Sequence, residues 1–115
     1  MNESILTSIK SLLGIGEDYN AFDTEIIMHI NSALSVLSQL GVRDADGYIV
    51  TSSDNKWSDI IKEGRNLEMV KTLIYFKVKK AFDPPQNGTV MSALDAQISE
   101  LEWRVNVEVD PEGVL

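Results

Sequence analysis

The chain has no cysteine and only one histidine among its 115 residues. The lack of cysteine excludes a disulfide framework and any site that holds a metal through thiolates. A nucleophile or metal centre built on the single histidine, His29, would need carboxylate or serine partners, and no motif in the sequence brings them together. We therefore expect no enzymatic activity, no metal and no cofactor, and we interpret His29 as a surface or interface residue.

Long apolar runs are also missing. No stretch reaches the roughly 18 uncharged apolar residues that a membrane-spanning helix requires. Residues 1–4 lack the basic region and the apolar segment of a secretory signal. These absences favour a cytosolic protein with no membrane partner.

Basic side chains are scarce, since 10 Lys and Arg against 18 Asp and Glu give a net charge of −8. Such a charge repels nucleic acid and argues against a free-standing DNA-binding protein. The imbalance is uneven, because residues 61–82 carry six basic side chains and only two acidic ones. This basic section could pack head to tail against an acidic section of a neighbouring copy, or it could form a solvated lysine face. Its members are Lys62, Arg65, Lys71, Lys77, Lys79 and Lys80.

The apolar residues, 43 % of the sequence, recur mainly at helical spacing. This spacing predicts helices from residue 2 or 4 to 13 and over residues 23–40, 67–82 and 87–105, with a shorter helix through Trp57, Ile60 and Ile61. Residues 48–51 are expected to form one brief strand within a loop. The prediction is an all-α fold, a small bundle of four to five helices. It comprises one domain over residues 1–105 and an extended or flexible acidic tail over residues 106–115.

Local signals mark the ends of these helices. Gly14 and Gly41 are placed to end the first two, and Asp23 is placed to cap the second. Gly64 is expected to end the short helix, and Asn66 to cap the helix over residues 67–82.

The last two predicted helices form a hairpin around Asp83-Pro84-Pro85. The two prolines lack backbone donors and fix φ, so the chain must leave the helix there. The helix before the break has two apolar faces and is predicted to be central in the bundle. The helix after it carries an apolar seam with alternating steps of three and four residues, formed by Met91, Leu94, Ile98, Leu101 and Val105.

The two tryptophans receive different interpretations. Trp57 is expected to close its loop over the core. Trp103 lies beside the seam and next to charged residues, so contact with a neighbouring molecule and packing in the core both remain open. We take as candidate interface residues the end of the last helix, the apolar positions of the tail and the lysines of the basic section, namely Trp103, Arg104, Val107, Val109, Lys71, Lys77, Lys79 and Lys80.

Five segments carry a resemblance to a known family. They are ILTSIKSLLG at residues 5–14, FDTEIIMHIN at 22–31, QLGV at 39–42, KVK at 77–79 together with FDPP at 82–85, and ISELEWR at 98–104. Together they resemble the small head-tail connector proteins of tailed bacteriophages, also described as adaptor or head-completion proteins. The resemblance extends from Ile5 to about Asn106.

The resemblance implies a helical protein without enzymatic activity that assembles as a ring beneath the portal after DNA packaging. Such a ring extends the channel and presents a surface for the next connector or the tail. The implied partners are further copies of the chain in a homo-oligomer that matches the twelve-fold symmetry of the portal, the portal protein, and the next connector or tail protein. DNA would only pass through the channel. The implied location is the host cytoplasm during assembly and then the head-tail junction of the virion.

Family members commonly dock on the portal through a flexible or extended terminal segment, for which residues 105–115 are the candidate here. Two other functions remain open. One is a DNA-packaging accessory protein that contacts DNA through Lys71, Lys77, Lys79 and Lys80. The other is a small acidic regulator that covers a basic surface of another protein.

Overall fold

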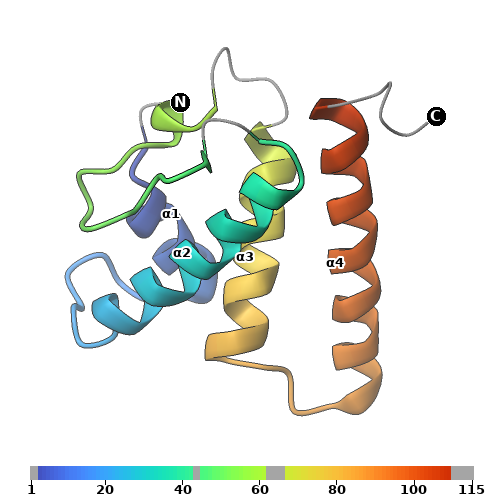
Figure 1. The fold of residues 1–115 in the computed structure, drawn as a ribbon. Helices are drawn as coiled ribbons and strands as arrows, with labels where there is room; N and C mark the ends of the chain where they lie inside the picture. Colours follow the sequence, from blue (N-terminus) through green and yellow to red (C-terminus); the bar gives the residue numbers. More distant parts are fainter. Residues whose placement is uncertain (1–2, 43–44, 62–66, 110–115) are drawn as a thin grey trace.

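Four α-helices make up most of the structure, a computed structural model that describes residues 3–42, 45–61 and 67–109. They are α1 (Ile5–Leu13), α2 (Asp23–Gln39), α3 (Leu67–Phe82) and α4 (Gly88–Val109), and a short 3-10 helix, η2 (Trp57–Asp59), precedes α3 (Figure 1). No strand occurs in these described ranges. The predicted all-α class is confirmed. The expected Gly64 and Asn66 end signals lie outside the described residues.

The ends of α1 follow from local sequence signals. The Ser4 side chain accepts a hydrogen bond from the backbone N–H of Thr7 at 3.1 Å, which satisfies one of the unpaired donors of the first turn. Gly14 ends the helix with φ of +82°, a conformation that side chains disfavour. The predicted stop at Gly14 is confirmed.

The start of α2 differs from the prediction. Asp23 is the first helical residue and not the cap, and Phe22, which occupies the cap position, makes no side-chain capping hydrogen bond. The Asp23 carboxylate lies 2.8 Å from the ammonium group of Lys10, whose side chain is only 3 % exposed. An unpaired ammonium group in the core costs more free energy than a missing helix cap. The ion pair with Lys10 therefore determines the position of the Asp23 side chain.

The loop between α2 and η2 is ordered by side chains and not by a strand. The Asn31 side chain accepts a hydrogen bond from the Val50 N–H at 2.8 Å and donates one to the Val50 carbonyl at 3.0 Å. An isolated antiparallel bridge joins Ser4 and Lys56. The strand expected at residues 48–51 is therefore absent from this described segment, because Asn31 supplies the hydrogen bonds that a neighbouring strand would have provided.

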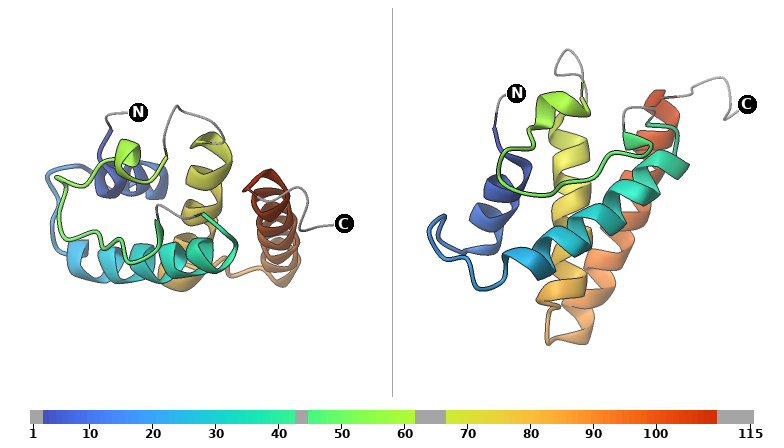
Figure 2. Two further views of the ribbon diagram at one scale, coloured as in Figure 1. Left: turned by 45° about the horizontal axis from the view of Figure 1, so that its top comes forward. Right: turned by 60° about the vertical axis from the view of Figure 1, so that its left-hand side comes forward.

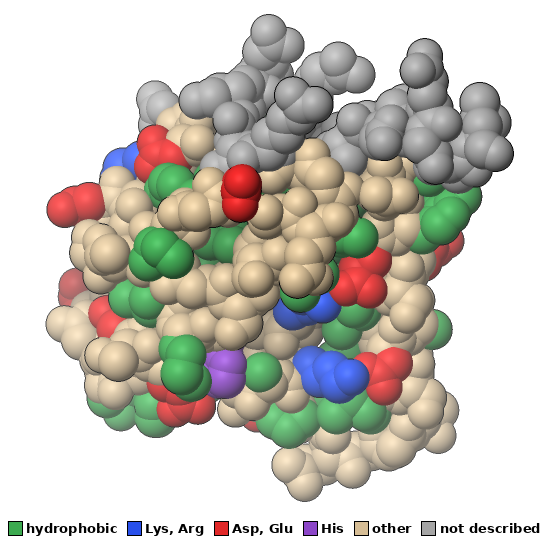
Figure 3. Space-filling view, in the orientation of Figure 1, with side chains coloured by type: hydrophobic (Ala, Val, Ile, Leu, Met, Phe, Trp, Pro, Cys, Tyr) green, Lys and Arg blue, Asp and Glu red, His purple; other side chains and the backbone are tan. Residues whose placement is uncertain are grey.

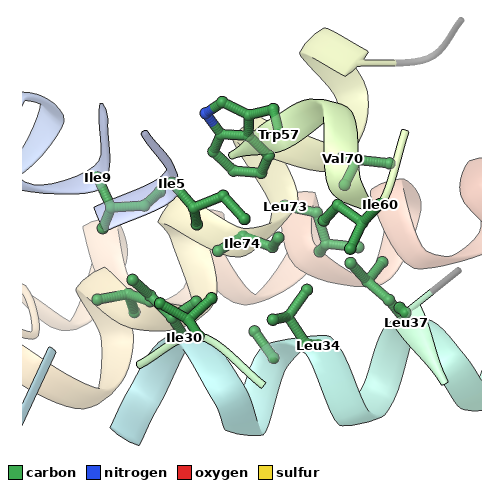
Figure 4. Close-up of a cluster of buried hydrophobic side chains, with 14 of the residues drawn as sticks. Ile5, Ile9, Ile30, Leu34, Leu37, Trp57, Ile60, Val70, Leu73 and Ile74 are labelled. Carbon is green, nitrogen blue, oxygen red and sulfur yellow. The ribbon is translucent and has the colours of Figure 1, made fainter. Parts of the chain in front are cut away.

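The core lies around α3, which packs against α1, α2 and α4. Figures 1 and 2 show α1 and α2 on one side of α3 and α4 on the other. Trp57 is fully buried, as predicted, and its indole N–H donates to Ser8 Oγ at 3.1 Å. Figure 4 shows this residue above a cluster built by α1, α2, α3 and the residue that follows η2. The cluster includes Ile5, Ile9, Ile30, Leu34, Leu37, Ile60, Val70, Leu73 and Ile74.

Along α3, α4 packs through the predicted seam. Ile98 and Val105 are buried, and Leu94 and Leu101 pack against the core while half-buried. The helix continues to Val109, past the predicted end at about Val105. Residues 110–115 of the predicted tail lie outside the described residues.

Candidate assembly surfaces

Trp103 stands on the outer face of α4. It follows the buried Ile98 by five residues, which at about 100° per residue turns it roughly 140° away around the helix. The ring is consequently 61 % exposed. Of the two interpretations of Trp103 left open by the sequence, packing in the core is excluded.

The other candidate residues of α4 lie next to Trp103 or in the last turns of the helix. Arg104 donates to the Glu100 carboxylate at 3.2 Å, and both side chains are more than half exposed, so this pair is weak. Val107, one turn further on, is half-buried. Val109 is the last residue of the helix.

The four candidate lysines of α3 all pair with carboxylates of the same molecule. The N···O distances are 3.4 Å for Lys71–Glu3, 2.7 Å for Lys77–Glu102, 2.8 Å for Lys79–Asp83 and 2.6 Å for Lys80–Asp95. The second and fourth pairs tie α3 to α4. Much of the charge contrast seen along the sequence is therefore met within one subunit, an arrangement that neither sequence-based interpretation anticipated.

A groove of about 360 Å³ lies between α2, α3 and α4. Its apolar wall includes Ala33, Val36 and Ala81, and Lys77 and Lys80 border it on the α4 side. In Figure 3 the purple histidine, which is His29, and the blue side chains to its right lie along this hollow.

A row of aromatic rings, which we call the aromatic row, runs from the α1–α2 loop to the end of α3. Ring centroids are 5.7 Å apart for Tyr19 and Phe22, 5.3 Å for Phe22 and Phe82, and 6.5 Å for Phe82 and His29. Tyr19 is 54 % and Phe22 41 % exposed. Sequence analysis missed this row, although two aromatic residues within an acidic loop were a signal for it.

Hydrogen bonds among Tyr48, Asn55 and Asp59 hold the loop between α2 and η2 in place. The Tyr48 hydroxyl donates to the Asp59 carboxylate at 2.6 Å, and the Asn55 amide donates to the Tyr48 hydroxyl at 3.0 Å. Burial and the contact with Asp59 raise the pKa of Tyr48 from 10.0 to about 12, so the phenol in the folded protein keeps its proton above pH 10. The network fixes the loop beneath η2.

The part of the chain that the structure describes contains neither a cluster of metal ligands nor a membrane-spanning helix. No three potential metal ligands among His, Asp and Glu cluster there. None of the helices described combines the length and apolarity needed to span a bilayer. What the described surface does offer is exposed apolar and aromatic area, which is characteristic of proteins that act by binding other proteins.

The fold and these surfaces describe a small all-α protein with exposed aromatic side chains. Its sequence matches the model of the phage connector protein family over residues 5–112. This match covers nearly the whole chain, and the protein belongs to that family, which confirms the resemblance noted from the sequence. No curated protein and no solved structure matches the chain. Phage connectors are structural components of the virion, which gives the protein its broad role.

Proposed function

We propose that the protein is a head-tail connector that assembles as a ring beneath the portal after DNA packaging. The ring extends the channel and offers its far surface to the next connector or the tail. Family membership supports the connector role. The ring, the matching of its copy number to the portal and the assembly stage in the host cytoplasm are part of the proposal.

The observation that carries this proposal is the apolar surface that one folded copy leaves exposed. Trp103 and the Tyr19–Phe22 pair remain in solvent although a closed core has formed around α3. Trp and Tyr are enriched among the side chains that dominate protein interfaces, and exposed rings in mutual contact, as in the Tyr19–Phe22 pair, form the kind of apolar patch that a partner covers.

The portal contact is proposed for the segment that follows Asn106. Val105, the first residue of the predicted docking segment, is buried in the core, and the Asn106 amide donates to the Leu40 carbonyl at 2.9 Å. Both residues therefore secure α4 to the bundle. The tail expected over residues 106–115 thus begins inside α4, which continues to Val109, and we propose that the docking segment starts after Asn106.

The structure gives the DNA-binding alternative no support. The four lysines on which it depends each have a carboxylate partner in the same molecule. Phosphates would have to displace these carboxylates and approach a protein with a net charge of −8.

Quantitative mass spectrometry of purified virions tests the proposed function. A connector ring should be present at a fixed ratio to the portal, with a copy number that matches portal symmetry, and it should remain with the head-tail junction when capsids and tails are separated. Absence of the protein from infectious particles that have normal heads and tails would contradict the proposal.

A further inference from the structure

Two different exposed surfaces lie on opposite flanks of the bundle. The α1–α2 loop occupies one flank and α4 the other in Figure 1, and the left view of Figure 2 shows the same order, with α3 between them. A subunit with two unlike adhesive surfaces on opposite flanks associates head to tail, and such contacts close into a ring when the rotation between copies permits.

The α4 flank presents an aromatic ring beside a cation. Trp103 is 61 % exposed, and the adjoining Arg104 side chain is 56 % exposed. Trp and Arg are the residue types most enriched among the side chains that dominate protein interfaces. The guanidinium group pairs with carboxylates and also stacks on aromatic faces.

The opposite flank presents aromatic rings beside anions. Tyr19 and Phe22 are exposed and in contact, and the exposed Glu17 and Asp18 directly precede them. The Lys10 ammonium donates to the Glu17 carbonyl at 3.1 Å, which anchors the loop from beneath. An anchored loop loses little freedom when it binds, so it is preorganised for a partner.

We propose that Trp103 and Arg104 of one copy bind the loop surface of the next copy, formed by Glu17, Asp18, Tyr19 and Phe22. The indole packs on the two rings, and the guanidinium group faces the two carboxylates. This pairing rests on the proposed ring and names the surfaces that build it. It is heterologous, since each copy uses one flank as donor and the other as receptor, so the contact can repeat around a ring.

Photo-crosslinking in the assembled particle tests the pairing. Benzoylphenylalanine is placed at Trp103, the protein is bound to portal-bearing heads, and crosslinked peptides are sequenced after irradiation. The expected product joins position 103 to residues 17–22 of another copy. The probe at Val90, which is 52 % exposed on the same helix, serves as the control and should not yield this product. Crosslinks from position 103 only to α4, to the groove or to the portal would overturn the pairing.

A charge exchange provides an independent measurement. Arg104→Glu places like charges opposite each other and should reduce the number of copies bound per head about tenfold, and Asp18→Arg in the same chain should restore most of the binding. Met28→Ala, which alters a residue 57 % exposed outside both surfaces, should bind like the wild type. Circular dichroism and thermal unfolding verify that each variant is folded. Normal binding of Arg104→Glu, or loss without restoration by Asp18→Arg, would overturn the pairing.

The two proposals fail in different ways. If the wild-type protein does not bind heads at all, the proposed connector ring is wrong. If it binds normally while the crosslinks and the charge exchange give the contrary results, only the assignment of surfaces is wrong.

Discussion

Individual side chains fix the α1–α2 junction in ways that their local sequence does not reveal. Lys10 is 2 % exposed and reaches both the Asp23 carboxylate and the Glu17 carbonyl. The Asp23 side chain, in contrast, is 27 % exposed and keeps some access to water. Removal of Asp23 therefore leaves a buried ammonium group without a carboxylate partner, whereas removal of Lys10 leaves a carboxylate that is partly exposed.

This asymmetry leads to a stability prediction. Asp23→Ala leaves a buried ammonium group without its carboxylate and should cost about 3 kcal/mol of unfolding free energy. Lys10→Met keeps most of the packing volume and leaves a carboxylate that water can reach, so it should cost less, about 1 kcal/mol. Urea unfolding at neutral pH measures both variants. Equal costs, or a larger cost for Lys10→Met, would show that the pair is not organised around the buried cation.

Tyr48 leads to a prediction about pH. Its pKa is raised from 10.0 to about 12 in the folded protein by burial and by Asp59, so the unfolded chain loses the phenolic proton first. The stabilisation is complete below pH 10 and declines as pH rises from about 10 to 12. Tyr48→Phe should remove this part of the decline. The check is the difference in unfolding free energy between wild type and variant across pH 8 to about 11.5. A difference independent of pH in this range would contradict the assignment.

At the residue scale, sequence analysis succeeded where a signal acts on its own neighbours. Gly14 ends α1 as predicted, because the carbonyl groups that its backbone N–H satisfies lie within one turn. Asp23 was assigned wrongly as a cap, since its partner Lys10 comes from another helix. Asn31 holds Val50, 19 residues further along the chain, and no local pattern reports such a contact.

At the scale of elements, the two faces of α4 differ in their exposure to solvent. The inner face buries Ile98 and Val105 against the core, while the outer face exposes Trp103. Leu101, interpreted from the sequence as part of the seam, is half-buried and packs against the core. The seam was predictable because, in an amphipathic helix, apolar residues that recur every three or four positions mark the buried face.

Substitutions on the two faces should separate folding from assembly. Ile98→Ala should destabilise the isolated subunit by about 2 to 4 kcal/mol, because it opens a cavity beneath α4. Trp103→Ala should change subunit stability by less than about 1 kcal/mol and yet impair assembly on heads. Thermal and urea unfolding of the isolated protein, followed by head binding, provide the measurements. Unfolding of the subunit by Trp103→Ala would show that the outer face belongs to the folding core.

The pairing between α3 and α4 was not predictable in the same way. The sequence marks Lys77 and Lys80 as basic and Glu102 and Asp95 as acidic, but which cation meets which anion depends on the register of the two helices. That register is set by how the connecting residues and the seam fit together in space. The aromatic row was missed for the same reason, since Phe82 meets Phe22 only through the tertiary fold.

At the scale of the whole molecule, the charge distribution predicts weak interaction with nucleic acid. Simultaneous replacement of Lys71, Lys77, Lys79 and Lys80 by Gln should lower the thermal stability modestly, because four carboxylates lose their cationic partners in largely exposed pairs. It should change binding to duplex DNA little. Fluorescence anisotropy with labelled DNA over a range of salt concentrations measures this. Tight wild-type binding with a steep salt dependence that disappears in the variant would instead support DNA contact.

The whole molecule combines a closed core with aromatic surface that the core does not cover. Its core is closed around α3, while both flanks keep aromatic side chains in solvent. The family match places such a subunit among phage connectors. In the proposed ring, neighbouring copies and the portal cover what the single copy leaves exposed.

The most direct measurement of the connector role uses DNA-filled heads that lack this protein and carry no tails. Purified protein is added, and the fraction of heads that keep their genome and accept purified tails is counted by electron microscopy and by infectivity. The account predicts that the wild-type protein restores genome retention and tail attachment. Heads that lose DNA and refuse tails equally with and without the protein would contradict it.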